Sequence, residues 1–155
     1  METSSDFQQT IGLLGGEETI RARIGSVMDA HDALLEGLPA DALLHLVSSV
    51  SLLERGETLQ NAVGISLRTL QRHKAGQKGA GRQRLSVEQS NRTWRFAELF
   101  AHAVEVMGSQ AAAEDWMNQP AIGLSNRKPI ELLGTSAGVE AVAEYLTRLE
   151  YGVYT

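Results

Sequence analysis

Residues 63–76 read Val63-Gly-Ile-Ser-Leu-Arg-Thr-Leu-Gln-Arg-His-Lys-Ala-Gly76 and have the spacing of a helix-turn-helix. Gly64 can adopt the left-handed backbone that a tight turn between two helices requires, because it has no Cβ atom. The hydroxyl group of Ser66 can then cap the second helix. The sequence therefore predicts two short helices, over Thr58 to Val63 and Ser66 to Ala75, joined by a glycine turn.

The second of these helices divides into an apolar face and a basic face. Leu67 and Leu70 point inward, whereas Arg68, Gln71 and Arg72 form one exposed stripe at positions i, i+3 and i+4. Arginine and glutamine bond bidentately to guanine and adenine edges, so the stripe can read bases in a major groove. The alternative is a basic face that is merely solvated. The residues expected to contact DNA are Ser66, Arg68, Thr69, Gln71, Arg72 and Lys74, together with Lys78, Arg82 and Arg84, which would follow phosphates from a glycine-rich loop.

Charge is distributed unevenly along the chain. Residues 61–95 hold eight of the 14 basic side chains and a single acid, Glu88, in a protein of net charge −5. The remaining residues therefore hold 6 basic and 18 acidic groups. Such a concentrated basic segment favours a polyanion as binding partner.

Length and composition restrict the class of protein. The chain has 155 residues, of which 43% are hydrophobic and 21% charged, as in ordinary globular domains. No apolar run approaches the roughly 18 residues that a membrane span needs, and the first residues lack a charged-then-apolar signal pattern. We therefore expect a cytoplasmic protein without a membrane partner. The absence of cysteine removes thiol nucleophiles and thiolate metal sites.

The rest of the chain predicts an all-α fold. Residues 1–16 are polar with several glycines, which indicates a leader with little fixed structure, and residues 16–36 are expected to hold one helix. Pro39 opens a helix that Gly56 ends. Ser86-Val-Glu-Gln89 has the form of a capping box, so a long helix should begin there and run to about Met107.

The apolar residues of that long helix cover more than one face, which suits a domain junction or a dimer interface. Further helical segments are expected over Ser109 to Gln119, Pro129 to Leu133 and Thr135 to Glu150, with a loop over Ala121 to Lys128. Alternating β-branched and aromatic residues are almost absent, so no sheet is expected.

Signals for an enzyme are weak. The histidines are scattered and lack partners at spacings typical of metal ligation, so we assign no metal, no cofactor and no catalytic residue; they are His31, His45, His73 and His102. The run Gly76-Gln-Lys-Gly79-Ala-Gly81 lacks the order of a phosphate-binding Walker loop. A small enzyme remains an alternative that a cleft with converging titratable groups would support.

The C-terminal third carries a more specific pattern. It reads Trp116-Met-Asn-Gln-Pro120-Ala-Ile-Gly-Leu124-Ser-Asn-Arg127-Lys-Pro129-Ile-Glu-Leu-Leu133-Gly-Thr135-Ser-Ala-Gly138-Val-Glu-Ala-Val142, followed by Glu150-Tyr-Gly-Val-Tyr154. This pattern resembles the toxin-binding domain of the Xre/MbcA/ParS family of antitoxins. Residues 64–72 and 85–89 are similar to the Xre-like segment of the same family, so the resemblance covers roughly residues 40–155.

The resemblance implies an antitoxin of a type II toxin–antitoxin system. Its partners would be a cognate toxin, most often a RES-domain protein that consumes NAD, and operator DNA of its own promoter, and a homodimer is expected. The expected domains are a leader at 1–36, outside the resemblance and either partly disordered or one helix, an Xre-like helix-turn-helix domain at 37–100 and a toxin-binding domain at 101–155. The rival interpretation is a stand-alone helix-turn-helix transcription regulator whose C-terminal domain dimerises or senses a ligand.

A proline-bounded loop and the chain end supply the expected toxin contacts. Basic side chains in acidic surroundings can meet an acidic or phosphate-binding pocket, and tyrosines are stiff anchors. We therefore predict toxin contacts for Arg127, Lys128, Tyr151, Gly152 and Tyr154, and core positions for Trp116, Leu124, Leu132 and Leu133. Family members commonly carry two glycines where this chain has Ser125 and Asn126; asparagine tolerates a left-handed backbone, which would preserve the loop.

Overall fold

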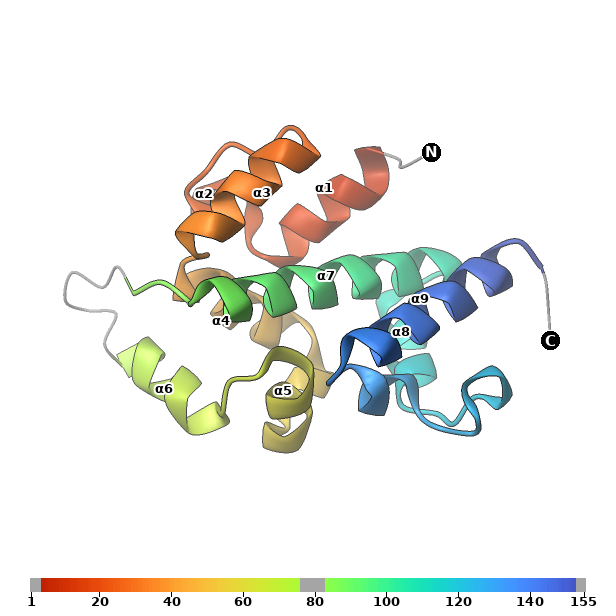
Figure 1. Cartoon of the computed structure of the whole chain (residues 1–155). Helices are drawn as coiled ribbons and strands as arrows, with labels where there is room; N and C mark the ends of the chain where they lie inside the picture. The colour runs from red at the N-terminus through yellow and green to blue at the C-terminus, as the bar shows by residue number, and fades with distance from the viewer. Residues whose placement is uncertain (1–3, 76–82, 153–155) are drawn as a thin grey trace.

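A computed structural model describes residues 4–75 and 83–152 and shows a protein built of helices (Figure 1). Within these ranges no β-strand is present, which confirms the all-α prediction, and no helix is long and apolar enough to cross a membrane. The elements are α1 (Ser4–Leu13), α2 (Gly16–Ile20), α3 (Val27–Glu36), α4 (Ala40–Ser49), η1 (Ser51–Glu54), α5 (Gly56–Val63), α6 (Leu67–Ala75), α7 (Val87–Met107), α8 (Gln110–Met117), η3 (Ile122–Leu124), η4 (Pro129–Leu132) and α9 (Ser136–Glu150).

The capping box at the start of α7 forms as predicted. The backbone N–H of Gln89 donates to Ser86 Oγ at 3.0 Å, and the N–H of Ser86 donates to Gln89 Oε1 at 3.1 Å. These bonds satisfy backbone donors that have no partner inside the helix. The helix ends at Gly108, whose φ of 97° lies in the left-handed region.

The prediction of little fixed structure for residues 1–16 was wrong for residues 4–13. Residues 4–13 form α1, which lies along α7, and Ile11 and Leu14 are buried. The ring of Phe7 meets that of Trp94 edge-on, with centroids 6.0 Å apart. A helix this short gains its stability mainly from the apolar face that it buries, so the polar composition of the segment was a poor guide.

The two segments that follow also differ from the prediction. Residues 16–36 form α2 and α3 instead of one helix, because Arg21 adopts a left-handed backbone with φ 64° after α2. The helix that follows Pro39 ends at Ser49, and the 3₁₀ helix η1 continues the chain. Leu53 of η1 is fully buried. Tertiary burial of apolar side chains, rather than a glycine stop, fixes the path of this segment.

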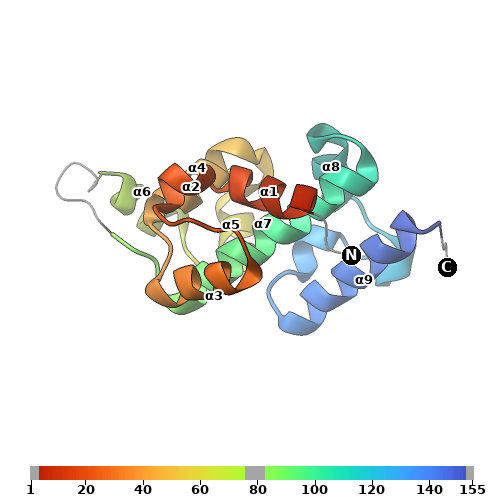
Figure 2. The same ribbon diagram turned by 90° about the horizontal axis from the view of Figure 1, so that it is seen from above.

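Helix α7 forms the centre of the molecule, as expected for a junction (Figures 1 and 2). Helices α1 and α3 pack on one side of it, and α5, α8 and α9 also contact it. One continuous group of buried side chains extends from Ile11 in α1 to Leu146 in α9. The two halves of the chain are therefore in close packing contact, while the division at residues 36 and 100 remains a prediction. Helix α6 and the C-terminal end of α9 lie at opposite ends of the molecule.

Candidate nucleic-acid and protein interfaces

The predicted turn between α5 and α6 forms with the expected chemistry. Gly64 has a φ of 82°, and its N–H donates to the carbonyl of Gln60 at 2.9 Å. The Oγ atom of Ser66 accepts a bond from the N–H of Thr69 at 3.1 Å, so Ser66 caps α6. The same hydroxyl donates to Thr69 Oγ1 at 2.9 Å. The two hydroxyls expected to flank a DNA contact are thus also part of the helix cap.

The stripe on α6 is exposed as predicted. Arg68, Gln71 and Arg72 face solvent, whereas Ile65 and Leu70 are buried beneath them. Because three long polar side chains share one face of a helix at the end of the molecule, that face can enter a groove of DNA. The side chain of Lys74 and all of Lys78 and Arg82 lie outside the described residues.

Arg84 has a role within the fold that the sequence did not suggest. Its Nη1 donates to the carbonyl oxygen of Gly37 at 2.7 Å. The adjoining backbone pairs with the start of α4: the N–H of Ala40 donates to the Gln83 carbonyl at 3.0 Å, and that of Leu85 to the Leu38 carbonyl at 2.8 Å. The guanidinium of Arg84 therefore stabilises the contact between residues 37–40 and residues 83–85, while phosphate contact by Arg84 remains a prediction.

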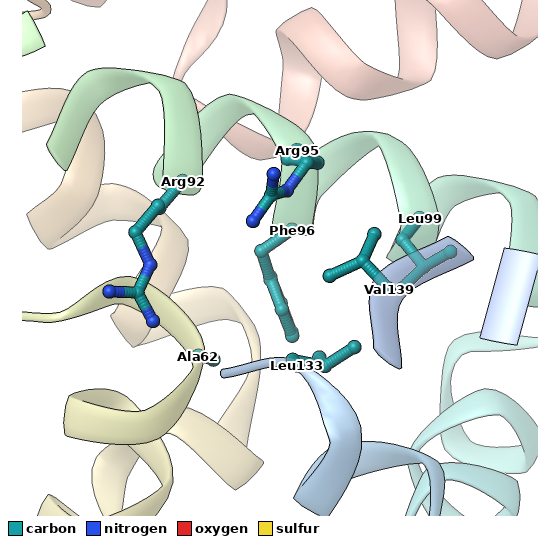
Figure 3. Close-up of a pocket in the computed structure, with 7 residues that line it drawn as sticks. All are labelled: Ala62, Arg92, Arg95, Phe96, Leu99, Leu133 and Val139. Atoms are coloured by element: carbon teal, nitrogen blue, oxygen red, sulfur yellow. The ribbon is translucent and has the colours of Figure 1, made fainter. Parts of the chain in front are cut away.

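Arg92 supports the turn from the side of α7, a contact that sequence reasoning missed. Its Nη2 donates to the main-chain carbonyl of Asn61 at 2.7 Å, which satisfies one of the unpaired carbonyls at the end of α5. Figure 3 shows the side chain reaching from α7 toward the neighbouring segment that carries Ala62. The helical spacing of Arg92 and Arg95 gave no signal of this contact, because the partner lies about thirty residues away in sequence.

The loop after α8 is closed by its own backbone. The N–H of Ala121 donates to the Arg127 carbonyl at 3.1 Å, and that of Asn126 donates back to the Ala121 carbonyl at 2.9 Å. Ser125 and Asn126 have φ values of 58° and 61°, both in the left-handed region. The backbone conformation that glycines favour is thus adopted here by a serine and an asparagine.

The expected protein contacts occupy this loop and the end of α9. Arg127 is exposed, Lys128 is half-buried at the start of η4, and Tyr151 is 75% exposed after α9. Gly152 is exposed with φ 75°. Tyr154 lies outside the described residues.

Ile122 is an addition to this set. Its side chain is 82% exposed, the highest value among the large hydrophobic residues found exposed. In the 3₁₀ helix η3 successive side chains point in different directions, so Leu124 is buried while Ile122 is not. An exposed isoleucine on the loop that carries Arg127 is a candidate apolar anchor.

A stacked aromatic pair packs against the loop that follows α8. The rings of Trp116 and Tyr145 lie 6.1 Å apart at 21°, and the guanidinium of Arg148 lies 5.7 Å from the centroid of Tyr145. Gly123 packs directly on the edge of the same tyrosine. Leu124 and Leu133 are buried, whereas Trp116 and Leu132 are half-buried and packed against the core, in agreement with the structural roles expected for them.

A small pocket, shown in Figure 3, lies at the junction between the two halves. Its volume is about 10 Å³, which is room for about one water molecule. The lining residues are Ala62, Arg92, Arg95, Phe96, Leu99, Leu133 and Val139. Within residues 4–75 and 83–152, no three histidine or carboxylate side chains lie close enough together to hold a metal ion.

Comparison with known proteins connects both surfaces to one family. Residues 29–98 match the antitoxin Xre-like helix-turn-helix domain, and residues 102–152 match the antitoxin Xre/MbcA/ParS C-terminal toxin-binding domain. The fold and its two surfaces thus define a class of helical proteins that join a DNA-binding motif to a toxin-binding domain.

Whole-chain relatives agree with the domain matches. An antitoxin Xre from Yersinia enterocolitica is 32% identical over 127 residues, which cover 80% of each chain. An antitoxin Xre from Photorhabdus laumondii is 30% identical over 77% of each chain, and one from Pseudomonas putida is 28% identical over 88% of this chain and 86% of its own length. The chain belongs to the Xre family of antitoxins.

Proposed function

We propose that this antitoxin neutralises a cognate toxin by covering the toxin's active site with its C-terminal domain and represses its own promoter through α6. The toxin is a RES-domain protein that consumes NAD, and the antitoxin itself carries no catalytic residue and needs no cofactor. It acts in the cytoplasm as a homodimer. It consists of a helical N-terminal segment at 1–36, the DNA-binding domain at 37–100 and the toxin-binding domain at 101–155.

One observation carries this proposal. Helix α6, which carries the exposed stripe, and the exposed C-terminal end of α9 lie at opposite ends of the molecule, near opposite ends of α7 (Figures 1 and 2). A macromolecule on one surface therefore leaves the other accessible. This arrangement suits a protein that holds a toxin and an operator at the same time.

The proposed toxin contacts combine charge with apolar anchors. Arg127 and Lys128 supply positive charge, and Ile122 and Tyr151 supply large side chains that are already exposed. Gly152 and Tyr154 complete the proposed set by their positions in the sequence after α9. Interfaces commonly concentrate their binding energy in a few such residues surrounded by weaker contacts.

Co-expression tests the proposal. The tagged chain is expressed together with the product of the adjacent open reading frame, and the pair is purified and analysed by light scattering. We expect a stable complex, cellular NAD that falls when the second protein is expressed alone, and NAD that is restored by the antitoxin. A chain that purifies alone from these cells, yet retains promoter DNA in a gel shift, would instead indicate a stand-alone regulator.

A further inference from the structure

Asn61 joins the helix-turn-helix to the segment that follows the C-terminal loop. It lies in the last turn of α5, and its Nδ2 donates to the carbonyl oxygens of Ile130 at 3.4 Å and Glu131 at 3.3 Å. Gly134 approaches from the other side, where a Cβ atom would lie 2.6 Å from Asn61 Oδ1. The half-buried amide therefore contacts both η4 and a residue shortly after it.

The main chain of the same residue faces the DNA-binding motif. Its carbonyl accepts the 2.7 Å bond from Arg92 Nη2, and Arg92 Nη1 lies 2.5 Å from the position that a Cβ on Gly64 would take. The left-handed backbone of Gly64 ends α5 and sets the direction in which α6 leaves the turn. Asn61 thus contacts η4 through its side chain, and through its backbone carbonyl it contacts Arg92, the residue that packs against the turn.

The connection to the toxin-facing loop is direct. Lys128 is the N-cap of η4, and Pro129, the first residue of that element, is buried. The main chain of Arg127 closes the loop through its bond with Ala121. A shift of η4 away from Asn61 would therefore move the end of the loop that presents both basic side chains.

We propose that Asn61 is a positioning residue that couples the two binding surfaces, an inference that rests on the function proposed above. A toxin that holds the loop also holds η4, and through Asn61 it restricts the turn before α6. Operator binding to the complex then requires less ordering than operator binding to the free antitoxin. Toxin binding therefore strengthens operator binding, and by thermodynamic reciprocity operator binding strengthens toxin binding by the same factor.

Two substitutions break the contact from opposite sides. Asn61→Asp keeps the size of the side chain and the carbonyl used by Arg92, but places carboxylate oxygens against two carbonyl oxygens that now lack a donor. Gly134→Ala leaves Asn61 unchanged and pushes its amide away. Asn91→Asp, on an exposed position of α7, is the matched control for the change in charge.

The measurement is the dissociation constant for a duplex that spans the upstream promoter, determined at one salt concentration. It is measured for the free antitoxin and for its purified complex with the product of the adjacent reading frame. We expect the complex of the parent and of Asn91→Asp to bind about fivefold or more tightly than the free protein. In Asn61→Asp and Gly134→Ala this ratio falls to about one. A substitution that only loosened the fold would weaken both states alike and leave the ratio unchanged.

Circular dichroism melts establish which variants are folded, and Gly134→Ala carries the test alone if Asn61→Asp is unfolded. A parental ratio of one, or a parental ratio kept in a folded variant, overturns the coupling while leaving the proposed function in place. A parent that binds neither the second protein nor the promoter overturns the proposed function together with the coupling.

Discussion

The guanidinium of Arg92 occupies the space in which a side chain at position 64 would begin. A Cβ atom on Gly64 would lie 2.5 Å from Arg92 Nη1, and the φ of Gly64 is 82°. Two separate physical reasons thus require glycine at the turn: the left-handed backbone and the close approach of a side chain from α7. The helix-turn-helix is held in place by the central helix as well as by its own turn.

Gly64→Ala should therefore cost more stability than the same change at Gly108. Both glycines have a left-handed φ, which costs a non-glycine residue about 1–2 kcal/mol. A Cβ on Gly108 meets nothing within 4 Å, so Gly108→Ala isolates the backbone cost. We expect Gly64→Ala to lower the free energy of unfolding by about 1 kcal/mol more, measured by urea denaturation. Equal losses would show that Arg92 moves aside freely.

Arg68→Ala and Arg72→Ala should each weaken promoter binding by about tenfold and leave toxin neutralisation intact. Both side chains are exposed on α6, and a bidentate contact to a base contributes about 1–3 kcal/mol. Arg23→Ala removes the same charge from an exposed position outside the motif. Retention is compared by gel shift at fixed salt. Loss of binding in Arg23→Ala to the same extent would mean that net charge, and not the stripe, governs affinity.

Arg84→Ala should act on stability more than on DNA affinity. The substitution leaves the carbonyl of Gly37 without its 2.7 Å donor at the crossing of residues 38–40 with 83–85. A hydrogen bond from a charged donor at a partly exposed site contributes about 1 kcal/mol. We expect the midpoint of thermal unfolding to fall by about 2–4 °C. An unchanged midpoint with a tenfold loss of promoter binding would assign Arg84 to phosphate contact instead.

The paired left-handed residues of the loop should respond to glycine in a defined order. Ser125→Gly removes more backbone strain than Asn126→Gly, because asparagine tolerates the left-handed region better than serine. The gain is reduced by the greater freedom of glycine in the unfolded chain. We expect Ser125→Gly to raise the unfolding midpoint relative to Asn126→Gly in calorimetry. The reverse order would show that contacts of the Ser125 side chain outweigh its strain.

Ile122→Ala and Tyr151→Ala should each weaken toxin binding by about tenfold without loss of stability. Both side chains are largely exposed, so their removal leaves no cavity in the fold, whereas truncation of an interface anchor commonly costs more than 1 kcal/mol. Met28→Ala, at a site 65% exposed on α3, is the matched control. Binding is measured by calorimetric titration with the co-purified partner. Parental affinity in both variants would remove these residues from the proposed interface.

Local signals in the sequence were sufficient for much of this protein. Capping side chains, turn glycines and helical periodicity act within a few residues of each other, so the boundaries of α7 and the cap of α6 followed from composition and spacing. The exposed stripe of Arg68, Gln71 and Arg72 followed in the same way, since one helical face must turn inward. The pattern of the C-terminal third indicated the family that the whole-chain relatives then showed.

Other features depended on contacts between distant residues. The polar first segment became α1 only because α7 offers Trp94 and neighbouring apolar side chains for it to cover. The roles of Arg84 and Arg92 were set by the carbonyls of Gly37 and Asn61, which no spacing along the chain brings near them. The partners of such a side chain depend on which distant segments pack together. That packing is decided by the burial of apolar side chains across the whole core. Sequence therefore determined the helices from α5 to α9, whereas only the tertiary structure decided the helices before α4 and which polar groups remain free for a partner.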